Sequence, residues 1–119
     1  MDLKSLEQAI RAAWGKDTCY PPAVSLWTPE KPELGQCTVT ALVVQDYLGG
    51  ELLYCKGHNH YWNRLPNGEE IDFTRSQFPP GTQLKVDEVR TRDQVLNDDS
   101  AIAMRTRERY ELLKSRVAL

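Results

Sequence analysis

The sequence predicts an α+β fold in which a buried central helix packs against a small antiparallel sheet. The first observation is an apolar run between Gly35 and Gly50, bounded by glycines and long enough for a helix. The second is a set of short runs rich in β-branched or aromatic residues between 51 and 74, separated by turn residues. The third is a helical pattern with an apolar face at each end of the chain. The 119 residues fit one domain, residues 1–119.

The first predicted element is a helix that Asp2 caps, that runs through Trp14 and that Gly15 ends. Its apolar residues recur on one face at helical spacing: Leu3, Leu6, Ala9, Ile10, Ala13 and Trp14. Residues 16–33 follow and contain four prolines, which interrupt any helix. Because this stretch also carries aromatic residues, we expect an ordered loop that caps the core or forms the wall of a pocket.

The central helix brings a cysteine, Cys37, into its first turn, directly after Gly35 and Gln36. The first turn of a helix has free backbone N–H groups and the positive end of the helix dipole. Both favour a thiolate over a thiol, so a cysteine at this position is expected to be reactive. The same N–H groups can also receive an oxyanion.

Three strands are predicted after the central helix, at residues 51–56, 60–65 and 70–74. The sequence Pro-Asn-Gly at 66–68 joins the second and third strands as a hairpin. Residues 83–89 are expected to add a short edge strand. Together these elements predict an antiparallel sheet of three or more strands.

The C-terminal part is predicted to be helical. Thr91 and Gln94 have the spacing of a capping box and begin a short helix, which residues 97–100 break. A last helix is expected from Ala101 to Val117, and its Arg and Glu residues are expected to form a solvated face with local ion pairs. The expected inner stripe consists of Ala103, Tyr110, Leu113 and Val117.

Three residue types suited to nucleophilic catalysis fall on these elements: Cys37 at the helix start, His60 on the second strand and Asp72 on the third. A base removes the thiol proton, and a third group fixes the orientation of the base. A three-residue hairpin loop would place Trp62 opposite Asp72, so that His60 and Asp72 share a face as diagonal neighbours. A two-residue loop would place them on opposite faces. In the predicted mechanism Cys37 attacks, His60 moves the proton and Asp72 orients His60.

Composition and charge exclude several partners. The net charge is −2 and no basic stripe occurs outside the last helix, which argues against nucleic acid and against a polybasic membrane anchor. No apolar run is long enough to span a bilayer, and the chain begins with a helix instead of an apolar leader. We therefore expect a cytoplasmic protein, in which three cysteines do not predict a disulfide framework.

Two resemblances to known families follow from these residues. The order of a helix with Cys37, a strand, a strand with His60 and a strand with Asp72 resembles the papain-like thiol enzymes, in particular their NlpC/P60 and transglutaminase-like branches. Five segments are similar to the YunG-like family of small bacterial proteins: 18–22 (TCYPP), 35–42 (GQCTVTAL), 47–50 (YLGG), 60–65 (HYWNRL) and 71–78 (IDFTRSQF). The second resemblance implies a bacterial, single-domain, cytoplasmic protein and carries no activity with it.

The sequence predicts a thiol hydrolase or acyltransferase that acts on an amide or related acyl bond through a thioester, without a cofactor or metal. Peptides, protein side-chain amides and small acyl compounds are the expected substrates. The backbone N–H of Cys37 would supply one oxyanion donor. Candidates for a second donor or for the pocket wall are Tyr20, Gln36, Trp27 and Trp62, with Tyr20 ranked first and Gln77 as a further candidate.

A non-catalytic function also stays open. The aromatic loop at 16–33 and the pair Tyr61-Trp62 could line a groove that binds a peptide or a small ligand. The polar residues at 37, 60 and 72 would then form a packing network in the same cleft. In that case Cys37 would show no thiol reactivity at neutral pH.

A zinc site is a further alternative. Cys55, His58 and His60 have the ligand types of such a site at close spacing, and Cys19 or Cys37 could complete a tetrahedron. No CxxC pair and no HExxH helix supports it. Cys19 is also a rival to Cys37 as a reactive thiol, but we expect it to serve packing.

Overall fold

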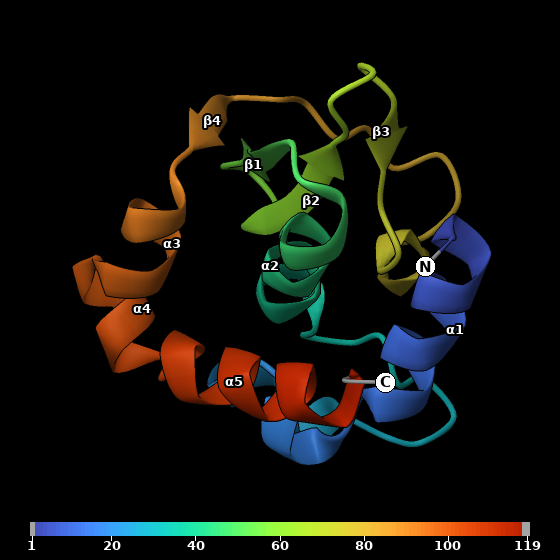
Figure 1. The fold of residues 1–119 in the computed structure, drawn as a ribbon. Helices are drawn as coiled ribbons and strands as arrows, with labels where there is room; N and C mark the ends of the chain where they lie inside the picture. Colours follow the sequence, from blue (N-terminus) through green and yellow to red (C-terminus); the bar gives the residue numbers. More distant parts are fainter. Residues whose placement is uncertain (1, 118–119) are drawn as a thin grey trace.

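A four-stranded antiparallel sheet and helix α2 form the centre of the fold in the computed structural model, which describes residues 2–117 (Figure 1). The strands lie in the order β3-β2-β1-β4. The central elements are α2 (Cys37–Leu48), β1 (Glu51–Cys55), β2 (His60–Arg64), β3 (Glu70–Ile71) and β4 (Glu88–Arg90). Helix α2 contacts β2 on one side and helix α5 (Thr106–Val117) on the other, so the α+β class is confirmed. Residues 1, 118 and 119 of the predicted domain lie outside the described residues.

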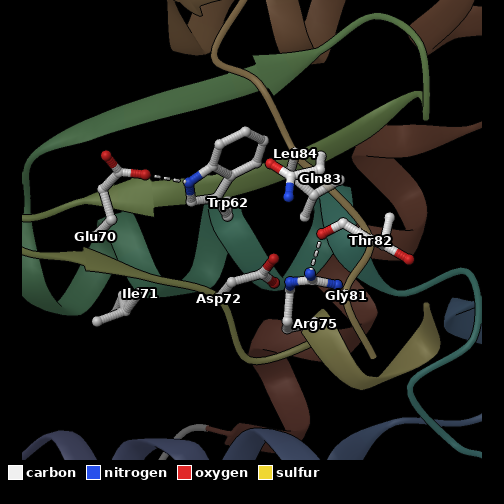
Figure 2. A pocket seen from close by; sticks show the side chains of 9 residues that line it. All are labelled: Trp62, Glu70, Ile71, Asp72, Arg75, Gly81, Thr82, Gln83 and Leu84. Atoms are coloured by element: carbon white, nitrogen blue, oxygen red, sulfur yellow. Dashed lines mark hydrogen bonds between the residues drawn. The ribbon is translucent and has the colours of Figure 1, made fainter. Parts of the chain in front are cut away.

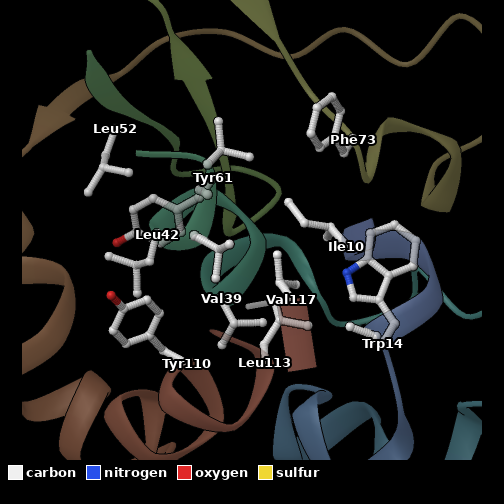
Figure 3. Close-up of a cluster of buried hydrophobic side chains, with 14 of the residues drawn as sticks. Ile10, Trp14, Val39, Leu42, Leu52, Tyr61, Phe73, Tyr110, Leu113 and Val117 are labelled. Atoms are coloured by element: carbon white, nitrogen blue, oxygen red, sulfur yellow. The ribbon is translucent and has the colours of Figure 1, made fainter. Parts of the chain in front are cut away.

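Helix α2 is buried because most of its circumference is apolar. All six residues from Val39 to Val44 are buried. A helix with apolar side chains on every face belongs in a core. Its core partners come from α1, α5, the sheet and the segment after β3, and Figure 3 labels Ile10, Trp14, Leu52, Tyr61, Phe73, Tyr110, Leu113 and Val117. The helix predicted between Gly35 and Gly50 is therefore confirmed.

The N-terminal helix α1 (Leu3–Ala13) begins where the sequence predicts. The Asp2 carboxylate accepts a hydrogen bond from the backbone N–H of Ser5 at 2.7 Å, which is an N-cap interaction. The buried residues of α1 are Leu6, Ile10 and Ala13, and the helix packs on α5. The loop that follows is ordered by two short 3₁₀ turns, Lys16–Thr18 and Pro21–Leu26.

The hairpin between β2 and β3 has the register that a three-residue loop predicts. Asn63 pairs with Ile71 and Arg64 pairs with Glu70. The predicted third strand, 70–74, is too long, because it ends at Ile71. There Asp72 leaves the ladder, and its Oδ1 accepts a hydrogen bond from the Thr74 backbone N–H at 3.1 Å.

The elements after the sheet match the predictions in part. The expected edge strand at 83–89 is present as β4, displaced to Glu88–Arg90, and pairs with β1 on the side away from β3. Helix α3 (Arg92–Asn97) has the predicted capping box, in which Thr91 Oγ1 accepts from the Gln94 N–H and Gln94 Oε1 accepts from the Thr91 N–H.

The prediction of one continuous helix from Ala101 to Val117 is wrong. The chain forms α4 (Asp99–Ala103) and then α5, and the break contains Arg105 with a φ of 55°. Asp98 caps α4, because its Oδ1 accepts a hydrogen bond from the Ala101 N–H at 2.8 Å. Since α4 is so short and turns away before α5 begins, Ala103 is exposed and does not belong to the inner stripe.

The helices of the described part are short. Within residues 2–117, none combines the length and the apolar character that crossing a bilayer requires.

Gly50 links α2 to β1 and provides a test of this architecture. Its φ is +87°, and a Cβ there would lie 2.2 Å from the carbonyl oxygen of Arg64. We expect Gly50→Ala to lower the free energy of unfolding by about 2–4 kcal/mol, because the left-handed backbone and the clash both oppose a side chain. Urea unfolding measures this loss. Gly57→Ala is the matched control, because no heavy atom lies within 4 Å of its Cβ position, and an equal loss in both variants would contradict the argument.

Candidate active site

A cavity of about 260 Å³ lies where the start of α2 meets the turn before β2 and the segment after β3. The first residue of α2, Cys37, opens onto it, as does the first residue of β2, His60. Its other lining residues come from the loop before α2, from the β1–β2 turn and from the segment after β3: Tyr20, Ala23, Leu34, Gly35, Thr38, His58, Asn59, Gln77 and Phe78. A thiol and an imidazole from distant parts of the sequence thus share one cavity.

Cys37 has the environment expected of a reactive thiol. It is half-buried, and its Sγ lies 3.7 Å from Thr38 Oγ1 and 4.0 Å from the carbonyl oxygen of Asn59. Burial alone would raise the pKa of the thiol. Hydrogen bonding and the charge of His60, together with the backbone N–H of Tyr61, outweigh burial and lower the pKa of Cys37. The site therefore favours a thiolate.

His60 is fully buried and held by contacts on several sides. Its Nε2 lies 2.7 Å from Asp72 Oδ2, and its Nδ1 lies 3.5 Å from Gln77 Nε2. Its ring stacks on Trp62, with centroids 5.7 Å apart, and meets Phe78 edge to face. Burial alone would lower the pKa of His60, but hydrogen bonds to Asp72 and Cys37 raise it to about 9. The electrostatics therefore favour an imidazolium paired with a thiolate.

Asp72 is positioned by the turn that ends β3. One carboxylate oxygen, Oδ2, faces His60, and the other, Oδ1, accepts from the backbone N–H and the hydroxyl of Thr74. Ile71 and Phe73 pack on the hydrophobic core, so the residue between them points to the opposite face of the hairpin. This is the face that the three-residue loop predicts for Asp72.

The structure brings two of the four predicted auxiliary residues to the site. Tyr20 lines the cavity, and its backbone N–H donates to the carbonyl oxygen of Gly35 at 2.8 Å, which ties the loop to the start of α2. Trp62 supports the ring of His60 from within the sheet. Its Nε1 donates to Glu70 Oε1, as Figure 2 shows.

Gln36 and Trp27, two of the candidates for a second oxyanion donor or for the pocket wall, do not line this cavity. Gln36 is fully buried, and its amide bonds to Thr18 Oγ1 and the Gly15 carbonyl oxygen, so it joins the N-terminal segment to α2. Trp27 Nε1 donates to the carbonyl oxygen of Pro32 and stabilises its own loop. Proximity to Cys37 in the sequence therefore misidentifies both side chains.

Three residues of the cavity wall are not among the predicted site residues. Asn59 and Thr38 line the site beside the thiol, and Phe78 packs against His60. The polar type of Thr38 next to Cys37 is a signal in the sequence, but nothing there marks Phe78. Gln77, which the sequence offered as a further candidate, does line the cavity. Its Nε2 lies 3.5 Å from Nδ1 of His60.

Comparison with known proteins places the chain in a family. The YunG protein family matches residues 2–119. The chain belongs to this family. A relative named "Uncharacterized protein YunG", from Bacillus subtilis (strain 168), is 35% identical over 78 residues, which cover 64% of this chain. The match spans 63% of the length of that relative. No solved structure matches the chain.

The other two cysteines of this YunG-family chain have environments unlike that of Cys37. Cys19 and Cys55 are both buried, and burial raises the pKa of the Cys19 thiol. Cys55 pairs with His60 across the β1–β2 ladder, whereas His58 is exposed in the turn. Among residues 2–117, no group of three or more His, Cys, Asp or Glu side chains has the arrangement of a metal site.

A second cavity, of about 380 Å³, has Asp72, the partner of His60, in its wall (Figure 2). Trp62, Glu70 and Asp72 form one wall, and the segment from Gly81 to Leu84 forms the other. Arg75 spans the space and donates to the carbonyl oxygen of Thr82. Asp72 therefore lines this cavity, whereas Cys37 and His60 line the first one.

Proposed function

We propose that this YunG-family chain is a thiol hydrolase or acyltransferase that acts on an amide or related acyl bond, with a papain-like arrangement of Cys37, His60 and Asp72. One observation carries the proposal. The imidazole of His60 is bonded to Asp72 through Nε2, while Cys37 at the start of α2 lines the same cavity as His60. A nucleophile, a base and a group that orients the base are the three parts of such a mechanism.

The reaction proposed for these residues begins with a thiolate on Cys37 and an imidazolium on His60. The sulfur attacks the carbonyl carbon and forms a C–S bond. The C–N bond then breaks, and the leaving amine takes its proton from His60. Water or an acceptor amine attacks the resulting thioester and gives a proton to His60, and the sulfur leaves again as a thiolate. Asp72 stabilises the imidazolium at both stages.

The oxyanion of the tetrahedral intermediate needs donors that are already in place. Helix α2 has no side-chain cap on its first turn, so the backbone N–H of Cys37 is proposed as one donor. Tyr20, which lines the cavity, is proposed as the second. The proposed substrates are peptides, protein side-chain amides or small acyl compounds.

Acetylation by p-nitrophenyl acetate tests the proposal directly. We expect mass spectrometry to find one acetyl group on Cys37, which disappears as the thioester hydrolyses or passes to an added amine. Cys37→Ala should abolish the rapid release of p-nitrophenol, whereas the buried Cys19 and Cys55 serve as internal controls in the wild-type protein. Absence of acetyl from Cys37, with folding intact, would refute the enzyme and favour a non-catalytic binding module.

A further inference from the structure

A third cavity, of about 110 Å³, has Thr38, the residue after Cys37, in its wall. It shares Tyr20, Thr38 and Asn59 with the cavity that contains the thiol. The two spaces are therefore neighbours across the first turn of α2. A group of a few heavy atoms fits the smaller space, since a single water occupies about 30 Å³ in the liquid.

Arg109 on α5 lines this cavity and is 6% exposed. Its guanidinium donates to the carbonyl oxygens of Met104 and Thr18 at 2.9 and 3.2 Å and to Thr106 Oγ1 at 3.4 Å. All three acceptors are neutral, and within residues 2–117 no carboxylate lies within ion-pair distance of Arg109. A buried cation without an anionic partner is costly, so this charge requires an explanation.

The other charges at this cavity do not neutralise Arg109. Arg90 and Asp98 also line it, but they bond to each other at 2.7 Å and cancel. His60 lowers the pKa of Cys37 and Cys37 raises the pKa of His60, so these two groups favour an ion pair with each other. Arg109 therefore has no carboxylate at ion-pair distance among the described residues. Burial lowers the pKa of Arg109, and the charges of Cys37, Cys19, Tyr20 and Glu108 oppose this effect without a direct bond.

The described hydrogen bonds of Arg109 leave two of its N–H donors unused. A guanidinium has five N–H donors, one on Nε and two on each terminal nitrogen. The bonds to Met104, Thr18 and Thr106 use one donor on each nitrogen, so one remains on each terminal nitrogen. A planar carboxylate can accept from two such donors at once.

We propose that this cavity is a carboxylate-binding subsite, in which Arg109 receives an anionic group of the substrate next to the carbonyl that Cys37 attacks. The inference rests on the proposed function and specifies it further. The substrates are amides or related acyl compounds that carry a free carboxylate close to the bond that is cleaved.

Two alkylating reagents that differ only in charge test the subsite. For each thiol, the rate with iodoacetate is divided by the rate with iodoacetamide. We expect this ratio to be at least about tenfold higher for Cys37 than for the thiol of glutathione. Arg109→Met should remove most of this preference, and Arg109→Lys should restore part of it. The attraction of iodoacetate to the imidazolium of His60 persists in all three proteins, so the difference between them reports Arg109 alone.

Two controls keep the test decisive. Arg107→Met removes an exposed charge from the same helix and should leave the reagent preference unchanged. If Arg109→Met does not fold, the alkylation of wild-type Cys37 by iodoacetamide is measured in the presence of succinate or of succinamide. We expect succinate, but not succinamide, to slow this alkylation. Normal reaction with iodoacetamide but no preference for iodoacetate, or a preference that survives Arg109→Met, would overturn the subsite alone. Failure of Cys37 to react with either reagent would overturn the proposed function and the subsite with it.

Discussion

Replacing His60 by alanine is expected to slow the alkylation of Cys37 by iodoacetamide roughly 100-fold near pH 6. Only the thiolate reacts, and an ordinary thiol is under about 1% ionised at that pH. In the wild-type protein, hydrogen bonding and the charge of His60 outweigh burial and lower the pKa of Cys37. Without the imidazole, burial dominates and the thiol stays protonated.

The rate of alkylation across a range of pH, read by mass spectrometry, measures this effect. His58→Ala is the matched control, because His58 lines the same cavity but is exposed and packs on Phe78. We expect its rate to remain within about twofold of the wild type, as for surface substitutions in general. Equal losses in the two variants, or slow and equal labelling of all three cysteines in the wild type, would contradict the thiolate–imidazolium pair.

Local sequence signals reduced the choices to one or two for the parts of the site that lie close together in the chain. The Pro-Asn-Gly sequence at 66–68 predicts the hairpin but leaves open a loop of two or three residues. The structure has the register of the three-residue loop, which places Asp72 on the face of His60. The glycines around α2 likewise place Cys37 in the first turn of a helix. In both cases the geometry follows from bonds within a few residues.

The proximity of Cys37 to His60 could not be predicted from local sequence signals. It depends on how α2 packs across β2, where Asn63 Nδ2 donates to the carbonyl oxygen of Ala41 at 3.0 Å. No spacing in the sequence encodes that contact. The same limit explains Gln36, which is adjacent to Cys37 in the chain yet bonds to the N-terminal segment.

The last helix gives the strongest contrast between pattern and packing. Its Arg and Glu residues predict a solvated face, and Arg109 is nevertheless buried. The break at Arg105 lets α5 contact both α4 and the 3₁₀ turn Lys16–Thr18. The guanidinium of Arg109 donates hydrogen bonds to the carbonyl oxygens of Met104 and Thr18, and these bonds hold it in a buried position. A charged residue thereby becomes part of a cavity wall beside the thiol.

The second large effect is expected for Asp72→Asn, which removes one negative charge and keeps the size of the side chain. Asn Oδ1 can still accept from Thr74, so the turn after β3 should persist. The imidazolium of the buried His60 then loses the carboxylate that its Nε2 contacts at 2.7 Å. We expect the pKa of His60, about 9 in the wild type, to fall toward its ordinary value, because Cys37 alone then opposes the effect of burial. Imidazole C–H shifts measured by NMR across pH follow this change.

The same substitution should also change the dependence of stability on pH. A histidine whose pKa is raised on folding stabilises the folded state fully below its unfolded pKa, and this stabilisation is lost as pH rises through the folded pKa. Wild type should therefore exceed Asp72→Asn by roughly 2 kcal/mol in unfolding free energy below about pH 6.5, and the difference should close as pH passes about 9. Glu70→Gln is the control, since Glu70 bonds to Trp62 and not to His60. A difference that is constant across pH would mean that Asp72 serves only the turn, and the His60–Asp72 pair would then have no electrostatic role.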